Sequence, residues 1–153
     1  ASTIGSIAGG WLADRIGDRI VTATGAGITA LGLVWISGLH AESSLPGIAM
    51  RVGLAGVGFG LHQAAVYSLA MRKTQPDHAG AGSAVLAVAQ TLGTPLSISF
   101  GMIIFTWRKD NAIDAGVLAT DAFVGAFHDA YLAAAGIAVL AGLVVMTVRR
   151  QRV

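Results

Sequence analysis

The chain has 153 residues, of which 54% are hydrophobic and only 12% are charged, and its mean hydropathy is +0.70. Soluble domains carry roughly 25% charged residues, so these numbers exclude a water-soluble domain. The formal net charge of +2 is too small to predict a nucleic-acid partner. The absence of cysteine rules out disulfides and thiolate metal sites. The solvent around most of this chain is therefore expected to be lipid.

The chain opens inside an apolar stretch, residues 1–13, that is too short to cross a bilayer. A hydrocarbon core of about 30 Å needs roughly 20 apolar residues in a helix. The stretch has no basic leader region, so a signal peptide is not expected. We interpret residues 1–13 as the end of a truncated transmembrane helix.

Four further runs are nearly free of charge, and each is long enough to span the membrane. We predict transmembrane helices at 20–39, 46–71, 79–107 and 122–148. The runs are apolar on all sides, whereas a helix of a soluble bundle has an apolar stripe and a charged opposite face. The segments that separate them are polar and are expected to be loops, at 14–19, 40–46, 72–78 and 108–121.

Basic residues favour one side of these predicted spans. Seven of them fall in the first and third polar segments and in the tail 149–153, namely Arg15, Arg19, Arg72, Lys73, Arg149, Arg150 and Arg152. Only Arg51, Arg108 and Lys109 belong to the opposite side. Cytoplasmic loops are enriched in Lys and Arg. We therefore expect a multi-pass protein of the plasma or inner membrane, with segment 14–19 and the C-terminal tail in the cytoplasm.

Residues 10–19 carry the most specific motif, Gly-Trp-Leu-Ala-Asp-Arg-Ile-Gly-Asp-Arg. Gly10 lets a neighbouring helix approach, and Gly17 can take the positive φ that a tight turn requires. Asp14 is an acceptor at a helix end, where it can bind an Arg or the free N–H groups of another helix. The motif resembles the cytoplasmic signature of the major facilitator superfamily, Gly-x-Leu-Ala-Asp-Arg-x-Gly-Arg-Arg/Lys, and departs from it at Asp18.

The resemblance implies an all-α, polytopic transmembrane helix bundle of the major facilitator type, of which this chain is a part. The Gly-rich run 51–61 and the later Gln-Thr-Leu-Gly-Thr-Pro at 90–95 look like the last helices of fourteen-helix drug:proton antiporters. A missing N-terminal half would then supply most of the transport site. In the family, the signature is thought to act as a conformational latch, which carries over to Gly10, Asp14, Arg15, Gly17 and Arg19.

On this resemblance we expect a secondary active transporter that exports drugs or other small organic molecules by alternating access, coupled to protons. The expected partners are the bilayer, the small-molecule substrate and protons, and no cofactor is implied. A metabolite uniporter or symporter and a non-transporting membrane fragment are the alternatives. An intramembrane enzyme would need a mid-membrane pair on facing helices, such as two acids or a Ser with a His or Lys. Only His62 comes near such a pair, so no enzyme is expected.

Polar side chains inside the predicted spans are candidates for the substrate pathway. At such depth they usually face the bundle interior or a cavity, which singles out His62, Gln63 and Gln90. An interhelical hydrogen bond is the alternative role for them. Asp129 and Arg51 are candidates for a proton or charge site. Their places near the outer ends of spans also fit a rim position and snorkelling to the interface.

Two glycine pairs have the Gly-x-x-x-Gly spacing, Gly5 with Gly9 and Gly56 with Gly60. This spacing allows two helix backbones to approach closely, within one bundle or between two chains. We expect close packing inside one bundle rather than dimerisation.

Overall fold

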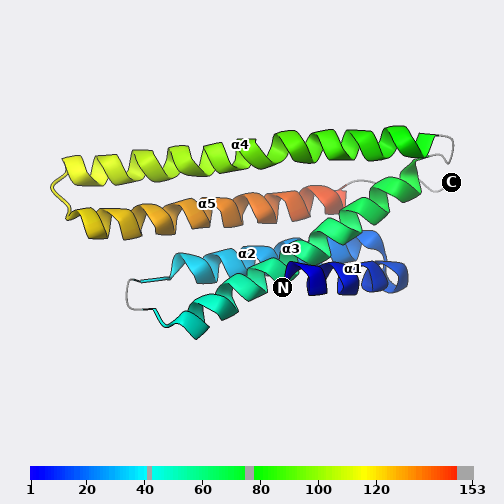
Figure 1. The fold of residues 1–153 in the computed structure, drawn as a ribbon, viewed down its shortest axis with the longest axis horizontal. Coiled ribbons are helices and arrows are strands. Elements are labelled where there is room, and N and C mark those ends of the chain that lie inside the picture. The colour runs from blue at the N-terminus through cyan, green and yellow to red at the C-terminus, as the bar shows by residue number, and fades with distance from the viewer. Residues whose placement is uncertain (41–42, 75–77, 148–153) are drawn as a thin grey trace.

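The computed structural model describes residues 1–40, 43–74 and 78–147. It consists of five helices, α1 (Ser2–Ile16), α2 (Asp18–Ser37), α3 (Leu45–Lys73), α4 (Ala79–Asp114) and α5 (Ala119–Thr147). No strand occurs in these ranges, which confirms the predicted all-α transmembrane bundle. The helices lie along one long axis, and α3 crosses the others obliquely (Figure 1).

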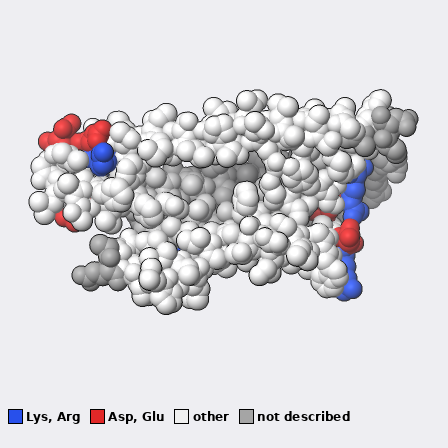
Figure 2. All heavy atoms as spheres, in the orientation of Figure 1, with Lys and Arg blue, Asp and Glu red and all other residues white. Residues whose placement is uncertain are grey.

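By length and composition, α2, α3, α4 and α5 can each cross a membrane. Figure 2 shows the charged side chains of one face gathered at the two ends of the molecule, with an uncharged middle between them. Such a charge-free band fits the apolar core of a bilayer. The chain is therefore a multi-pass membrane protein.

The helices continue beyond the apolar runs that predicted them. α1 extends to Ile16 and α2 begins at Asp18, so the loop expected at 14–19 is corrected to a single residue, Gly17. α4 likewise continues through 108–114. A charged residue ends a membrane span but does not end a helix, because the backbone hydrogen bonds of the helix are independent of the solvent around it.

The last span also differs in its bounds. α5 begins at Ala119, before the expected start at 122. Val148, the expected last residue of this span, lies outside the described residues. So does the tail 149–153, which we expect in the cytoplasm.

α2 is the central helix, because it packs against α1, α3 and α5, whereas α4 packs mainly against α5. The core is made of small and medium side chains, with Ala13, Val21, Leu61 and Ala65 buried together. Membrane helices associate through such close packing, since lipid gives no hydrophobic driving force between them.

The glycines of the two Gly-x-x-x-Gly pairs lie where α1 meets α3. A Cβ on Gly9 would come within 2.9 Å of Leu61 Cα, and Gly5 and Gly60 leave even less room against Val57 and Ser2. These glycines therefore serve helix packing within one chain, as the sequence predicts.

Candidate functional site

The signature residues meet at the turn between α1 and α2, and Arg72 from the end of α3 joins them. Arg72 Nη2 lies 2.5 Å from Asp14 Oδ1, and Arg72 Nε lies 3.3 Å from Asp18 Oδ2. One guanidinium thus binds the last turn of α1 and the first turn of α2. We refer to Asp14, Asp18, Arg19 and Arg72 as the motif cluster.

Gly17 makes this arrangement possible. Its φ of 96° is a conformation that residues with a side chain rarely adopt, and it lets α2 start immediately after α1 ends. The two acids on either side of this glycine are thereby brought to the same guanidinium.

Asp18 occupies the position at which the resembling signature has a basic residue, yet it is buried, with 9% exposure. As the first residue of α2, it lies at the positive end of the helix dipole. Its Oδ2 faces Arg72, and its Oδ1 has no hydrogen-bond partner within the described residues. Asp18, the residue at which the chain departs from the signature, is therefore a second carboxylate partner of Arg72.

Arg19 connects the same turn to α5. Its Nη2 donates to the carbonyl oxygen of Met146 at 3.0 Å and to that of Val145 at 3.4 Å. These carbonyls belong to the last described turn of α5. Arg19 thus fixes the end of α5 against the start of α2.

Two other signature residues take no part in the cluster. The Arg15 guanidinium lies 4.0 Å from the Trp11 ring centroid, in a cation–π contact within α1. A Cβ on Gly10 would meet nothing within 4 Å in the described part of the chain. No described helix makes the close approach expected at Gly10, because its neighbour Gly9 is the one that faces α3.

His62 lies at the contact between α3 and α2. Its Nδ1 donates to the carbonyl oxygen of Thr22 at 3.2 Å. Gln63, the next residue, makes no side-chain hydrogen bond within the ranges described. The geometry of His62 is that of an interhelical hydrogen bond, the alternative role considered for it.

Replacing His62 with Leu is expected to lower the free energy of unfolding by about 1 kcal/mol, because it removes one interhelical hydrogen bond. Thermal unfolding of the purified protein in detergent measures this. Thr24→Val is the matched control, since the Thr24 hydroxyl bonds only within its own helix. Unchanged unfolding together with lost transport would instead assign His62 to the substrate pathway.

Gln90 on α4 is bound by Tyr67 on α3, a residue that the sequence analysis did not select. The Tyr67 hydroxyl donates to Gln90 Oε1 at 2.6 Å. No described side-chain contact joins Gln90 to His62, so the structure does not gather the three predicted pathway residues into one site. In the sequence, the only sign of this contact is a tyrosine near the polar end of an apolar run.

At the opposite end from the motif cluster, three hydrogen bonds tie helix ends together. Arg108 Nε donates to Asp129 Oδ2 at 2.5 Å and joins α4 to α5. His128 Nδ1 donates to the carbonyl oxygen of Ser37 at 3.0 Å and joins α5 to α2. Arg51 Nη1 donates to the carbonyl oxygen of Trp35 at 3.1 Å and joins α3 to α2. Arg51 and Asp129 thus both make contacts that hold neighbouring helices.

Asp129→Asn is expected to destabilise the protein by at most about 1 kcal/mol, because the Arg108–Asp129 pair lies towards one end of the bundle and is only partly buried. The difference in melting temperature between variant and wild type should shrink as salt is added. A loss of transport far larger than this loss of stability would indicate a proton or charge role for Asp129.

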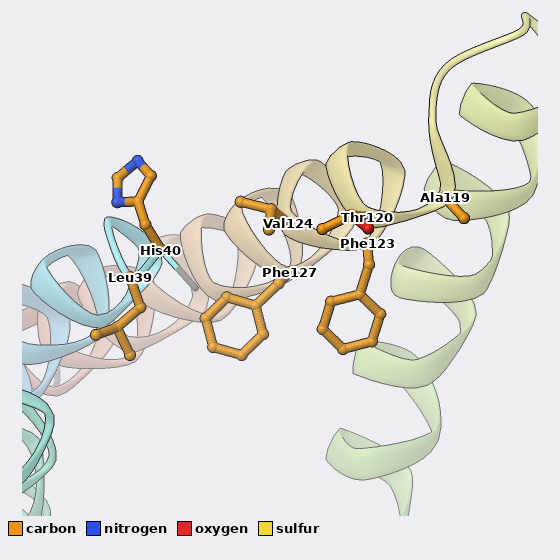
Figure 3. Close-up of a pocket in the computed structure, with 7 residues that line it drawn as sticks. All are labelled: Leu39, His40, Ala119, Thr120, Phe123, Val124 and Phe127. Atoms are coloured by element: carbon orange, nitrogen blue, oxygen red, sulfur yellow. The ribbon is translucent and has the colours of Figure 1, made fainter. Parts of the chain in front are cut away.

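Two apolar cavities, both open at the surface of the chain, flank the first half of α5. One has a volume of about 490 Å³, and Figure 3 shows its walls, which come from Leu39 and His40, just after α2, and from the first turns of α5. The other, of about 470 Å³, lies between α4 and α5. Phe123 and Phe127 line both cavities, and the Phe105 ring packs edge-on against Phe123 at 5.1 Å between centroids. Cavities with such walls suit apolar ligands.

Sequence reasoning missed these cavities for a physical reason. Phe123 and Phe127 are four residues apart and share a helix face. Within an apolar span, however, such a pair gives no sign of whether it faces lipid, another helix or a cavity.

The profile of the Major Facilitator Superfamily matches residues 1–153. The chain is 35% identical over 109 residues to a triacylglyceride transporter of Mycolicibacterium hassiacum, covering 65% of the chain and 20% of that protein. It is 29% identical, over an alignment of 175 residues, to a triacylglyceride transporter of Mycolicibacterium smegmatis, and the alignment covers 94% of the chain and 31% of that protein.

The chain therefore spans only about a fifth to a third of these relatives. The superfamily match, by contrast, extends over its whole length, and the relatives are transporters rather than enzymes. The chain belongs to the major facilitator superfamily.

Proposed function

We propose that this chain is part of a secondary active transporter that exports apolar, lipid-like molecules by alternating access, driven by protons. The motif cluster is the observation that carries the proposal. At one end of the bundle, Arg72 binds acids from α1 and α2, and Arg19 binds carbonyls in the last described turn of α5. Such charge-assisted bonds can stabilise one packing of this end relative to another.

The proposed latch differs from the one that the signature alone implies. Asp14, Gly17 and Arg19 stay in it, and Asp18 and Arg72 are added because they share one ion-pair network. Arg19 stays because it ties α5 to α2. Gly10 and Arg15 are left out, since a Cβ on Gly10 would meet no described neighbour and Arg15 lies over Trp11 of its own helix. We place the latch in the cytoplasm, on the basis of the asymmetry in basic residues.

A neutral lipid is the substrate class that the chain favours. The relatives are named triacylglyceride transporters, and the two cavities beside Phe123 and Phe127 have apolar walls. No Asp or Glu occurs in 52–71, 79–107 or 130–147. Asp129, the one acid in the predicted spans 46–71, 79–107 and 122–148, is paired with Arg108, so these spans offer no unpaired carboxylate to a cationic drug.

Export of flat aromatic drugs, as in the fourteen-helix antiporters, is the second candidate. The edge-on pair Phe105–Phe123 favours it, because aromatic ligands stack on such rings.

The proposal is tested with the full-length transporter in cells that lack their own exporters. A fluorescent triacylglyceride and a fluorescent cationic dye are followed in parallel, with and without an uncoupler. We expect lipid to reach the cell surface, and we expect the uncoupler to stop it. Dye export without lipid export would support the drug antiporter. Export of neither from a correctly inserted protein would reject both.

A further inference from the structure

Most hydroxyl groups along the first half of α4 are already committed to their own helix. Thr91, Thr94 and Ser97 each donate to a backbone carbonyl three or four residues earlier. Gln90 differs, because its side-chain oxygen accepts a hydrogen bond from Tyr67 on another helix. Its Nε2 donates to no protein atom within the described residues, which leaves two N–H donors uncommitted.

The position of Gln90 makes these donors significant. Gln90 follows the first residue of α4 by 11 positions, which is about 16 Å along the helix axis and therefore within the bilayer. An unsatisfied donor in an apolar environment costs free energy that a suitable acceptor would recover. Polar side chains at this depth in a membrane bundle face a cavity or the bundle interior more often than they face lipid.

The residues near Gln90 indicate which kind of hydrogen-bond acceptor its free N–H groups can bind. An N–H group does not bind a cation, and neither 52–71 nor 79–107 contains a Lys or Arg that would hold an anion. The remaining partners are neutral acceptors, and a carbonyl oxygen is the strong neutral acceptor that an apolar lipid carries. In an apolar lipid, the carbonyl groups belong to the esters that join the acyl chains to glycerol.

We propose that Gln90 is a specificity-determining residue that donates a hydrogen bond from Nε2 to an ester carbonyl of a neutral acylglycerol. Tyr67 is its positioning residue. By binding Oε1 at 2.6 Å, the Tyr67 hydroxyl holds the oxygen end of the amide towards α3, so the N–H₂ end is presented away from α3. This inference rests on the proposed lipid transport.

The test compares a labelled triacylglyceride with its triether analogue, which has the same chains but no carbonyl groups. Both are offered together to cells that express the full-length transporter, and the ratio of exported ester to exported ether is measured. We expect the wild type to prefer the ester by about tenfold, the discrimination of one hydrogen bond. Because the ratio is internal to each sample, differences in expression cancel.

Gln90→Met keeps the length of the side chain but removes the donors, and it is expected to bring the ester-to-ether ratio close to one. Tyr67→Phe should lower the ratio about threefold, because the amide remains but is no longer held. Thr91→Val is the matched control and should keep the wild-type ratio, since the Thr91 hydroxyl binds Ala87 O in its own helix. Gln90→Leu provides a second donor-free variant if the Met variant fails to fold.

The outcomes separate the inference from the function on which it rests. A wild type that exports ester and ether equally would overturn the role of Gln90 while leaving lipid transport intact. So would a Gln90→Met variant with an unchanged ratio. A wild type that exports neither lipid would overturn the proposed function itself.

Discussion

Replacing Arg72 with Gln in the full-length transporter is expected to lower export about tenfold, with an unchanged amount of protein in the membrane. Arg72 is the shared cation of Asp14 and Asp18. Removing one partner of a buried ion pair costs about 3–5 kcal/mol. The Arg72 side chain is 56% exposed, so screening reduces this cost to about 1–2 kcal/mol. A tenfold change corresponds to about 1.4 kcal/mol.

Two further variants show whether the loss arises from the motif cluster. Adding Asp18→Asn to the Arg72→Gln variant should restore part of the export, because the buried carboxylate no longer lacks a cation. Lys109→Gln is the matched control at the other end of the bundle, where Lys109 pairs only with its neighbour Asp110. If the Arg72→Gln variant exports as well as the wild type, the signature only sets topology.

The Gly25→Ala variant is expected to destabilise the folded protein by about 1–3 kcal/mol, the usual cost of overpacking a close contact. A Cβ at this position would lie 2.5 Å from the backbone N of His62 and 3.0 Å from the carbonyl O of Gly58. These are backbone atoms of α3, so they can give way only if the two helices move apart. The midpoint of thermal unfolding in detergent measures the loss.

Gly27→Ala is the matched control on the same helix. A Cβ at Gly27 would meet nothing within 4 Å of the described structure. Alanine has the higher helix propensity, by up to about 1 kcal/mol, so this variant should be as stable as the wild type or more so. Equal destabilisation by both substitutions would show that α2 and α3 do not pack as described.

The sequence predicts the number and order of the spans well, because a bilayer requires long apolar runs and this chain has four of them. It predicts the turn at Gly17 for a similarly local reason, since the signature places a glycine between two helix ends. The ends of the helices are less predictable. Charged residues such as Asp14 and Arg108 mark where lipid ends, yet each of them lies inside a helix.

The partners of the site residues could not be predicted, because they depend on how helices distant in sequence approach one another. Asp14 and Arg72 are 58 residues apart in the chain, and the sequence pattern around Arg72 indicates only the orientation of the spans. The choice between Gly9 and Gly10 as the contact residue depends on the rotation of α1 against α3. The hydroxyl of Tyr67 finds Gln90 for the same reason.

Proton-driven lipid export can be measured with the purified full-length transporter in liposomes under an imposed pH gradient, with wild type and the Arg72→Gln variant side by side. We expect the wild type to export triacylglyceride only while the gradient lasts, and the variant to retain about a tenth of that rate. Wild-type protein of verified orientation that moves no lipid under the gradient would contradict the proposed function.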